Sequence, residues 1–321
     1  NFSIDVEKTI YHAENLIDQG CHGVAIFGST GQAQLISVSE KIKMLNTLSS
    51  SKYKDKYIIG TGLNSLSETI NLMKIAMSLN FKRFLIMPPA YYKYGDKEVI
   101  SFYSKIVEQI PKSEIILYNF EKLCGYKFSV RCVEYLAQKF PNQIIGVKDS
   151  SYNLYENLKL DNFSILPGSE SMLLKGLKLG CHGIITATCN VTASLSRKVY
   201  EDFINGSEQN SNEKLCEVRK IFEEFNLISA IHAFMAQVDN SYNNILEFFK
   251  KLHFTRKTIK LINPDYIIVQ SENNAIFINL ALVFIKIPIA LFIFGQMFQF
   301  KNDLTKYAFI FKKQFSLIRN S

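Results

Sequence analysis

Several patterns that would assign a function directly are missing from this chain of 321 residues. Its six cysteines form no Cys-x-x-Cys pair, and its five histidines show neither His-x-His nor His-x-x-x-His spacing. A disulfide framework and a zinc site built from neighbouring residues are therefore not expected. Scattered, reduced thiols are instead typical of a protein of the cytoplasm.

Two nucleotide-binding patterns are also missing. No Gly-x-Gly-x-x-Gly follows any of the predicted strands, which counts against a dinucleotide-binding sheet. The turn at residues 28–31 lacks the Gly-Lys-Ser/Thr sequence of a phosphate-binding loop. The net charge of +8 does not indicate a nucleic-acid-binding surface either. Most of it comes from residues 254–321, which hold nine Lys or Arg and three Asp or Glu. The remainder is nearly neutral, so we expect no nucleic-acid partner.

The chain does contain seven short apolar runs, each followed by Gly, Pro, Ser or Asn. Each run is too short for a helix and too continuous for a half-exposed strand, which predicts buried parallel strands. The runs are 23–31, 56–62, 82–89, 114–120, 143–151, 163–170 and 182–190.

Helical patterns lie between these runs, for example at 65–80, where Ser65 and Glu68 have the spacing of a capping box. Alternating strands and helices predict an α/β fold with a parallel sheet wrapped by helices. A (β/α)8 TIM barrel is the natural closure, with its first strand upstream of Asn1 and missing from this chain. A doubly wound open sheet is the structural alternative.

Three regions are expected along the chain. Residues 1–206 would form the barrel without its first strand, residues 207–250 a C-terminal helical extension, and residues 251–321 a hydrophobic and basic tail of unknown status. The tail segment 275–298 has a single charge, Lys286, and is long enough to span a bilayer, although Lys286 and Pro288 near its middle weaken that reading. A membrane anchor and an out-of-frame translation are the two explanations for the tail.

A lysine, Lys148, stands at the end of the fifth run and is followed at once by Asp149. The carboxyl ends of barrel strands carry the chemistry of such folds. Burial disfavours the charged ammonium, and a neutral amine can attack a carbonyl carbon to form a Schiff base. The alternative is a lysine whose amine simply reaches solvent.

Two further features lie at predicted strand ends. Tyr118 ends the fourth run, where a phenol could relay protons or be a buried tyrosine with one hydrogen bond. In Gly28-Ser29-Thr30-Gly31, backbone N–H groups and two hydroxyls could hold a carboxylate, or the segment could be a tight turn.

Three motifs stand in order: GSTG at 28–31, YN at 118–119 and GVKD at 146–149, with PPAYYK at 88–93 between the first two. Together they resemble the dihydrodipicolinate synthase / N-acetylneuraminate lyase family of Schiff-base aldolases over about residues 1–250. The resemblance implies a (β/α)8 barrel, Schiff-base chemistry on pyruvate or another 2-oxo acid, and no metal or organic cofactor. It also implies a homo-oligomer, either a tetramer or a dimer.

The resemblance implies a role for each matching residue. Lys148 would form the Schiff base, Tyr118 would relay protons, and Tyr92 would reach into a neighbouring subunit's site. The residues expected to bind or line the substrate are Ser29, Thr30, Gly168, Ser169, Glu170 and Ile184.

Departures from the family pattern bear on the substrate. Dihydrodipicolinate synthases usually continue Tyr-Asn with an arginine that binds the carboxylate of the aspartate semialdehyde adduct, and Leu123 occupies that place here. The motifs around Lys148 and Gly168 are most similar to those of 2-keto-3-deoxy-sugar-acid aldolases. We therefore expect retro-aldol cleavage of such a sugar acid to pyruvate and an aldehyde. The alternatives are dihydrodipicolinate synthase activity and a non-catalytic, degenerate 2-oxo-acid-binding barrel.

Overall fold

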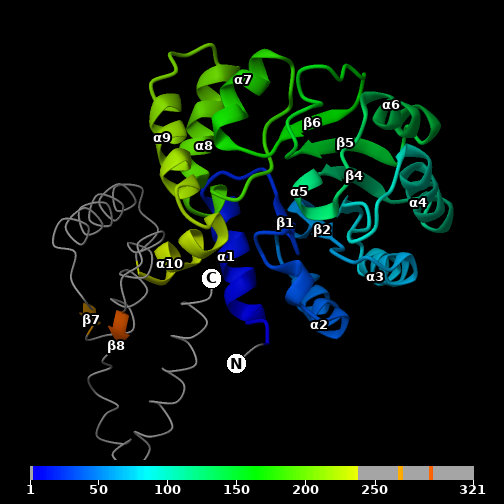
Figure 1. Cartoon of the computed structure of the whole chain (residues 1–321), viewed down its shortest axis with the longest axis horizontal. Helices are drawn as coiled ribbons and strands as arrows, with labels where there is room; N and C mark the ends of the chain where they lie inside the picture. Colours follow the sequence, from blue (N-terminus) through cyan, green and yellow to red (C-terminus); the bar gives the residue numbers. More distant parts are fainter. Residues whose placement is uncertain (1–2, 238–266, 270–288, 292–321) are drawn as a thin grey trace, which may run out of the picture. The chain divides into compact units, whose positions relative to one another are not determined.

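The computed structural model describes residues 3–237, 267–269 and 289–291, and the chain divides into two compact units, Asn1–Arg219 and Lys220–Ser321. The first unit is built on a six-stranded parallel sheet in which each strand pairs with the next one in the chain (Figure 1). The strands are β1 (Val24–Ile26), β2 (Tyr57–Gly60), β3 (Arg83–Ile86), β4 (Glu114–Asn119), β5 (Ile144–Asp149) and β6 (Ser164–Pro167).

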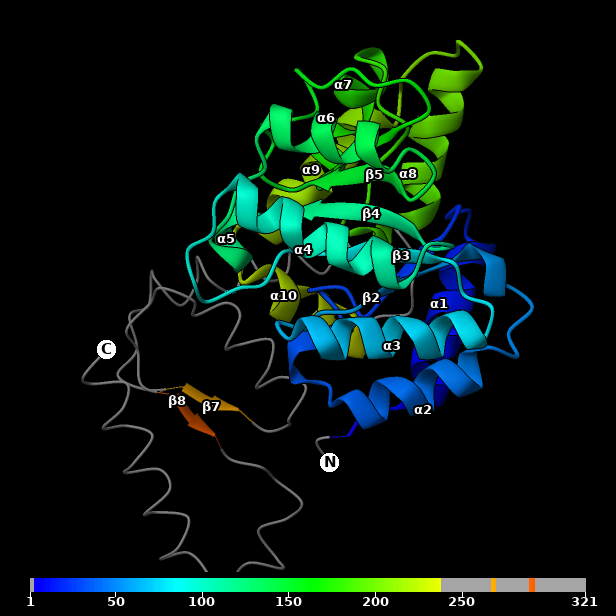
Figure 2. The same ribbon diagram turned by 90° about the vertical axis from the view of Figure 1, so that its right-hand side faces the viewer.

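Helices connect these strands and cover one face of the sheet, as Figures 1 and 2 show for α2, α3, α4 and α6. The α-helices that lie wholly within this unit are α1 (Val6–Asp18), α2 (Val38–Leu48), α3 (Leu66–Ser78), α4 (Asp96–Gln109), α5 (Glu121–Cys124), α6 (Val130–Lys139), α7 (Leu173–Lys178) and α8 (Cys189–Ile204). Three short 3-10 helices are η1 (Ala33–Leu35), η2 (Lys54–Lys56) and η3 (Glu170–Met172). The predicted alternation of strands and helices is thus confirmed for a parallel sheet wrapped by helices.

The two faces of the sheet bury different sets of side chains. Ile115, Leu117 and Val147 belong to the large core between the strands and the helices. Ile116 and Tyr118 belong to a second cluster on the opposite, inner face. Because successive strand residues point to opposite faces, this alternation decides which side chains reach the interior of the curved sheet.

The prediction of a seventh strand at residues 182–190 is wrong. Segment 182–186 is joined to β6 by two backbone hydrogen bonds. The His182 N–H donates to the Ile165 carbonyl at 3.1 Å, and the Ile185 N–H donates to the Pro167 carbonyl at 3.2 Å. Gly183, between them, has a φ of +143°, a conformation that L-residues in strands avoid and that interrupts the regular ladder. The last two residues of the predicted run, Cys189 and Asn190, already belong to α8.

Serine caps begin several of the helices, and the cap at Ser65 lies where the sequence predicts it. Ser37 caps α2 in a complete capping box with Glu40, and the Ser65 hydroxyl accepts a hydrogen bond from the Glu68 N–H at the start of α3. These bonds satisfy backbone donors that the first turn of a helix leaves without partners.

Helix α9 (Asn212–Glu223) and helix α10 (Leu227–Gln237) lie within the segment expected to form a helical extension, and residues 238–250 lie outside the described residues. The division of the chain into three regions stays a prediction. In the second unit, β7 (Ile267–Val269) and β8 (Ile289–Leu291) pair in parallel. The candidate span 275–298 lies outside the described residues except for β8, which is a strand. In the part of the chain that the structure describes, no helix is long and apolar enough to cross a bilayer.

We expect Ser37→Ala to lower the free energy of unfolding by about 1 kcal/mol, because it removes the acceptor for the Glu40 N–H. Urea unfolding followed by far-UV circular dichroism measures the change. Ser39→Ala is the control, since it alters a serine of the same first turn and leaves the bond from the Glu40 N–H in place. Equal losses for the two variants would contradict the capping role of Ser37.

Candidate active site

Tyr118 and Lys148 are direct partners in the register of β4 and β5. The Lys148 Nζ lies 4.1 Å from the centre of the Tyr118 ring, and both side chains are almost completely buried, with 8% of Lys148 exposed. An amine is therefore held beside a phenol on the inner face of the sheet, at the carboxyl ends of two strands. The roles of the two residues as nucleophile and proton relay stay predictions.

Ser29 joins this pair from the turn that follows β1. Its hydroxyl and the Tyr118 hydroxyl are 2.8 Å apart and share a hydrogen bond. The turn is shaped by left-handed backbone conformations on either side of it, with φ of 60° at Phe27 and 55° at Gln32. Thr30 lies next to Ser29 in this turn and is half-buried.

The amine lies over the face of the phenol ring, and the phenol hydroxyl bonds to the serine hydroxyl, so three polar groups gather at three strand ends. A proton can pass along hydrogen-bonded hydroxyls, and an amine 4.1 Å from the ring centre can react with a carbonyl whose oxygen lies near the phenol. The geometry therefore suits carbonyl addition coupled to proton transfer.

Gly168 lies at the end of β6, where its N–H donates to the Asp149 carbonyl at 3.0 Å. A Cβ at this position would come within 2.3 Å of the Ser150 Oγ, so a side chain would push the loop after β5 away. Ser169, which is buried, begins η3 and its hydroxyl accepts a bond from the Ser171 N–H. The two residues support the loop beside Lys148.

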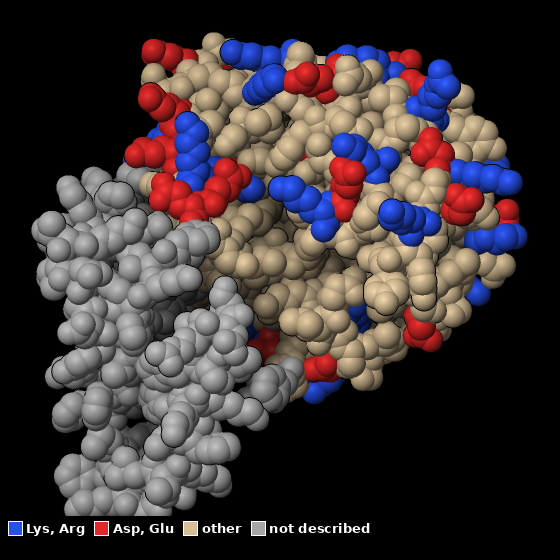
Figure 3. All heavy atoms as spheres, viewed as in Figure 1, with Lys and Arg blue, Asp and Glu red and all other residues tan. Residues whose placement is uncertain are grey.

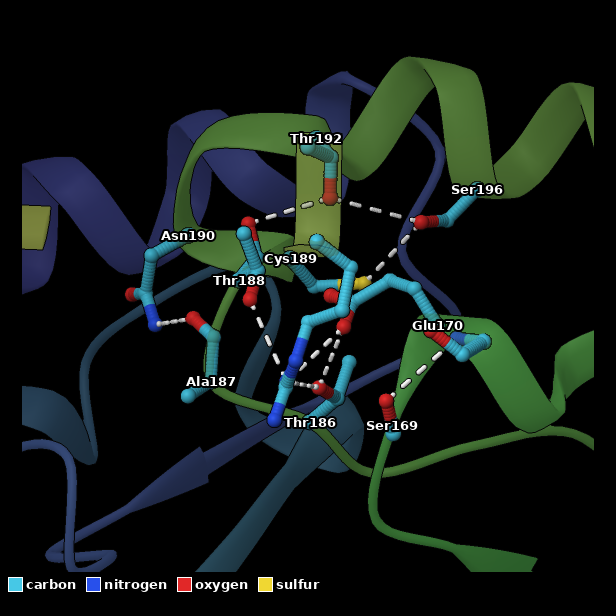
Figure 4. Close-up of polar contacts among 11 residues, drawn as sticks. Ser169, Glu170, Thr186, Ala187, Thr188, Cys189, Asn190, Thr192 and Ser196 are labelled. Carbon is cyan, nitrogen blue, oxygen red and sulfur yellow. Dashed lines mark hydrogen bonds and ion pairs between the residues drawn. The ribbon is translucent and has the colours of Figure 1, made fainter. Parts of the chain in front are cut away.

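Glu170 is completely buried and pairs with Arg219 of α9, a residue that the sequence analysis missed. The Arg219 Nη1 lies 3.0 Å from Glu170 Oε2, 3.0 Å from Thr186 Oγ1 and 3.2 Å from Thr188 Oγ1. Figure 4 shows Glu170, Thr186 and Thr188 converging from the segments that follow β6. The other carboxylate oxygen, Oε1, is buried with no hydrogen-bond partner among the described residues.

This ion pair ties α9 to the end of the sheet. Removing one partner of a buried pair leaves an uncompensated charge, which makes the two residues interdependent. Glu170 and Arg219 are separated by 49 positions, so no local pattern could have joined them. The role of Glu170 in substrate binding stays a prediction.

Two predicted residues lie apart from Lys148. The Ile184 side chain packs with Leu173, Leu177, Val199 and Leu215, whereas its neighbour Ile185 packs in the inner cluster of Tyr118. Tyr92 has 67% of its surface exposed and contacts Tyr91 edge to face. Within one chain, therefore, neither side chain is brought to the amine.

A second buried lysine, Lys41, lies on α2 and was also missed. Its Nζ donates to the Thr61 carbonyl at 2.8 Å, and burial lowers the pKa of Lys41 to about 8. Lys41 falls at core spacing with Met44, Leu45 and Leu48, so the sequence carried a signal for its burial. Lys41 competes with Lys148 as a candidate amine, but it lies on a helix rather than among the strand ends.

Charged side chains are mixed on the face of the molecule drawn in Figure 3, where Lys and Arg alternate with Asp and Glu. Most ion pairs of the described residues are exposed, such as Lys105 with Glu108 and Lys127 with Glu121. Exposed pairs contribute little to stability. The buried pair of Glu170 and Arg219 is the exception.

Comparison with known proteins assigns this fold and these motifs to one protein family. The model of the dihydrodipicolinate synthetase family matches residues 3–248. The chain belongs to this family. An uncharacterized DapA-like lyase of Chloroflexus aurantiacus is 27% identical over 237 residues, which cover 72% of this chain and 79% of that protein. A 4-hydroxy-tetrahydrodipicolinate synthase of Listeria monocytogenes is 28% identical over 63% of this chain and 71% of its own length.

Among solved structures, YagE of E. coli K12, a prophage protein of the dihydrodipicolinic acid synthase family solved in complex with pyruvate, has a similar fold. The TM-score is 0.66 at 22% identity, covering 72% of this chain and 81% of YagE. Family membership, expected from the three motifs, is confirmed, and with it a lyase or aldolase enzyme.

The buried amine of Lys41 makes stability depend on pH. Its pKa of about 8 in the folded protein is below the value of about 10.4 for an unfolded chain, so between these values the unfolded state binds more protons. The free energy of unfolding should therefore rise as the pH increases from about 8 to about 10, by at most about 1.4 kcal/mol per pH unit. Urea unfolding over this range measures the rise.

Lys41→Met should remove this pH-dependent rise, because it removes the group that titrates. Lys43→Met, at an exposed position of the same helix, is the matched control and should keep the rise. A Lys41→Met protein with the pH profile of the parent would show that another group titrates.

Proposed function

We propose that this protein is a Schiff-base-forming lyase that cleaves a 2-keto-3-deoxy sugar acid to pyruvate and an aldehyde. The observation that carries the proposal is the buried Lys148 amine 4.1 Å from the Tyr118 ring, with the phenol hydrogen-bonded to Ser29. The finer fold that goes with it is a (β/α)8 barrel. The first strand, expected upstream of residue 1, stays a prediction.

The reaction starts when the neutral Lys148 amine attacks the C2 carbonyl of the substrate and water leaves as the C=N bond forms. The protonated imine then accepts the electron pair of the C3–C4 bond. The Tyr118 phenol gives its proton to the oxygen that leaves as water in the first step, so its oxygen accepts the proton of the C4 hydroxyl as the C3–C4 bond breaks, and the aldehyde departs. The remaining enamine takes a proton at C3, and water hydrolyses the imine to pyruvate and the free amine.

Substrate binding follows the same geometry. Ser29 and Thr30 lie in the turn after β1, where hydroxyls and N–H groups can hold the carboxylate of the 2-oxo acid. Gly168 leaves room for the loop that carries Ser150, beside Lys148. We place the reaction in the cytoplasm and in a homo-oligomer, in which the exposed Tyr92 would contact the site of a neighbouring subunit.

A second function, 4-hydroxy-tetrahydrodipicolinate synthase, remains in consideration because the Listeria relative carries that name. Both reactions begin with the same imine, and they differ in the aldehyde that the enamine meets. Leu123, on α5, is 44% exposed and stands where synthases usually carry an arginine for a second carboxylate. A leucine cannot form that bidentate ion pair, which favours the aldolase.

The Schiff base is tested by adding pyruvate and sodium borohydride and mapping the modified peptide by mass spectrometry. We expect reduction to attach the pyruvate carbons to Lys148, and Lys148→Met to abolish the modification. Lys41→Met is the matched control, a second buried lysine whose loss should leave the modification in place. Modification of Lys41 instead of Lys148 would show that Lys41 is the amine that forms the Schiff base. No modification of folded protein would favour the non-catalytic alternative.

The substrate is tested by comparing the parent with Leu123→Arg, using Leu123→Met as control. We expect the parent to cleave 2-keto-3-deoxygluconate and not to condense pyruvate with aspartate semialdehyde. Leu123→Arg should change the cleavage rate by less than about twofold, because Leu123 is not expected to touch the sugar acid. Condensation by the parent at a rate above cleavage would reverse the assignment and make the synthase the better description.

A further inference from the structure

Two polar side chains lie directly after the proposed catalytic pair, on the opposite face of the sheet. Asn119 follows Tyr118 on β4, Asp149 follows Lys148 on β5, and the two are paired in register. Both are completely buried. Neither side chain belongs to the inner face, so neither can touch a substrate bound at Lys148.

The two side chains form a closed hydrogen-bond network. The Asn119 Nδ2 donates to Asp149 Oδ1 and to Asn153 Oδ1, both at 2.8 Å, and the Asn119 Oδ1 accepts from the Phe128 N–H at 3.1 Å. The second carboxylate oxygen of Asp149 accepts from the N–H groups of Leu154 at 2.8 Å and Tyr155 at 3.0 Å. The network therefore joins the two strand ends to the loops that follow them.

The register at this place needs such a constraint. The partner of Ile115 is Ile144, but the partner of the next residue, Ile116, is Gly146, so Ile145 is an extra residue in β5. Ile145 packs in the inner cluster, so regular alternation would place Val147 on the inner face and Lys148 on the outer one. Val147 packs in the outer core instead, which shows that the bulge brings Lys148 to the inner face. A shift by one residue would turn Lys148 towards the helices.

Bonds beyond the bulge decide whether this register holds. The strands pair over Ile116 to Asn119, and the pair of Asn119 and Asp149 is the last of these. Its bonds to a buried carboxylate are charge-assisted, which makes them stronger than bonds between neutral groups. A fully satisfied buried network also favours a single arrangement over near alternatives.

We infer that Asn119 and Asp149 are positioning residues that hold the Lys148 amine against the Tyr118 phenol, an inference that rests on the proposed function. Asp149→Asn replaces a carboxylate oxygen with an NH2 group, so either the N–H groups of Leu154 and Tyr155 or the Asn119 amide lose their acceptor. The strand ends then shift relative to each other, and the amine no longer faces the phenol in the reactive geometry.

Pyruvate alone suffices for the test. Borohydride trapping reports imine formation at Lys148, and exchange of the pyruvate C3 hydrogens in D2O reports proton transfer from imine to enamine. A displacement of about 1 Å can cost about 100-fold in rate, so Asp149→Asn should slow C3 exchange by about 10- to 100-fold. The KM for pyruvate should change by less than about threefold, because the carboxylate contacts at Ser29 and Thr30 remain.

Asp96→Asn is the matched control. Asp96 accepts hydrogen bonds from the hydroxyls of Tyr126 and Ser129, so it is also a carboxylate that joins a loop after β4 to a neighbouring helix. This variant should lower Tm and leave C3 exchange within about twofold of the parent. If Asp149 had a structural role alone, Asp149→Asn would likewise lower Tm and leave C3 exchange within about twofold of the parent.

The outcomes separate the two claims. Trapping by the parent together with unchanged exchange in Asp149→Asn overturns the positioning role and leaves the proposed function standing. No trapping by the parent overturns the proposed function and the positioning role with it. If Asp149→Asn does not fold, Asn119→Ala replaces it, because that variant keeps the carboxylate with its bonds to Leu154 and Tyr155, and the same fall in exchange is expected.

Discussion

The register between β4 and β5 is the constraint on which the site depends. With one extra residue at Ile145, Tyr118 and Lys148 become direct neighbours on the inner face. If β5 ran through Ile145 without a bulge, the alternation of side chains would carry Lys148 to the face covered by helices. A single irregularity in one strand therefore decides whether the amine is available for chemistry or enclosed in the outer core.

Buried polar groups are found where loops and helices meet the ends of the strands. The pair of Asn119 and Asp149, the pair of Glu170 and Arg219, and the bond from Lys41 to Thr61 each join segments distant in sequence. Such groups are costly to bury and are tolerated when each has a partner. The apolar core between sheet and helices supplies the stability, and these polar contacts select one arrangement of the strand ends.

The same site chemistry serves more than one reaction in this family. An amine that forms an imine and a phenol that relays protons are required by both aldol cleavage and aldol condensation. What separates the reactions is the group that receives the aldehyde partner. Under the proposed function, Leu123 takes that place and supplies no charge, so the distinction would lie in one side chain outside the pair of Lys148 and Tyr118.

Local patterns in the sequence determined much of this protein. Apolar runs predicted all six strands, the spacing of Ser65 and Glu68 predicted where α3 begins, and three short motifs predicted the family and the neighbourhood of Lys148, Tyr118 and Ser29. These features were readable because propensity, capping and strand burial act over a few neighbouring residues.

Only the tertiary structure decided the rest. Neither the bulge at Ile145 nor the loss of the seventh strand at Gly183 is visible in composition or periodicity. The ion pair of Glu170 and Arg219 spans 49 positions and the bond of Asn119 to Asp149 spans 30. Such contacts form only after the chain has packed, because the free energy of burying a polar group depends on which distant partner reaches it.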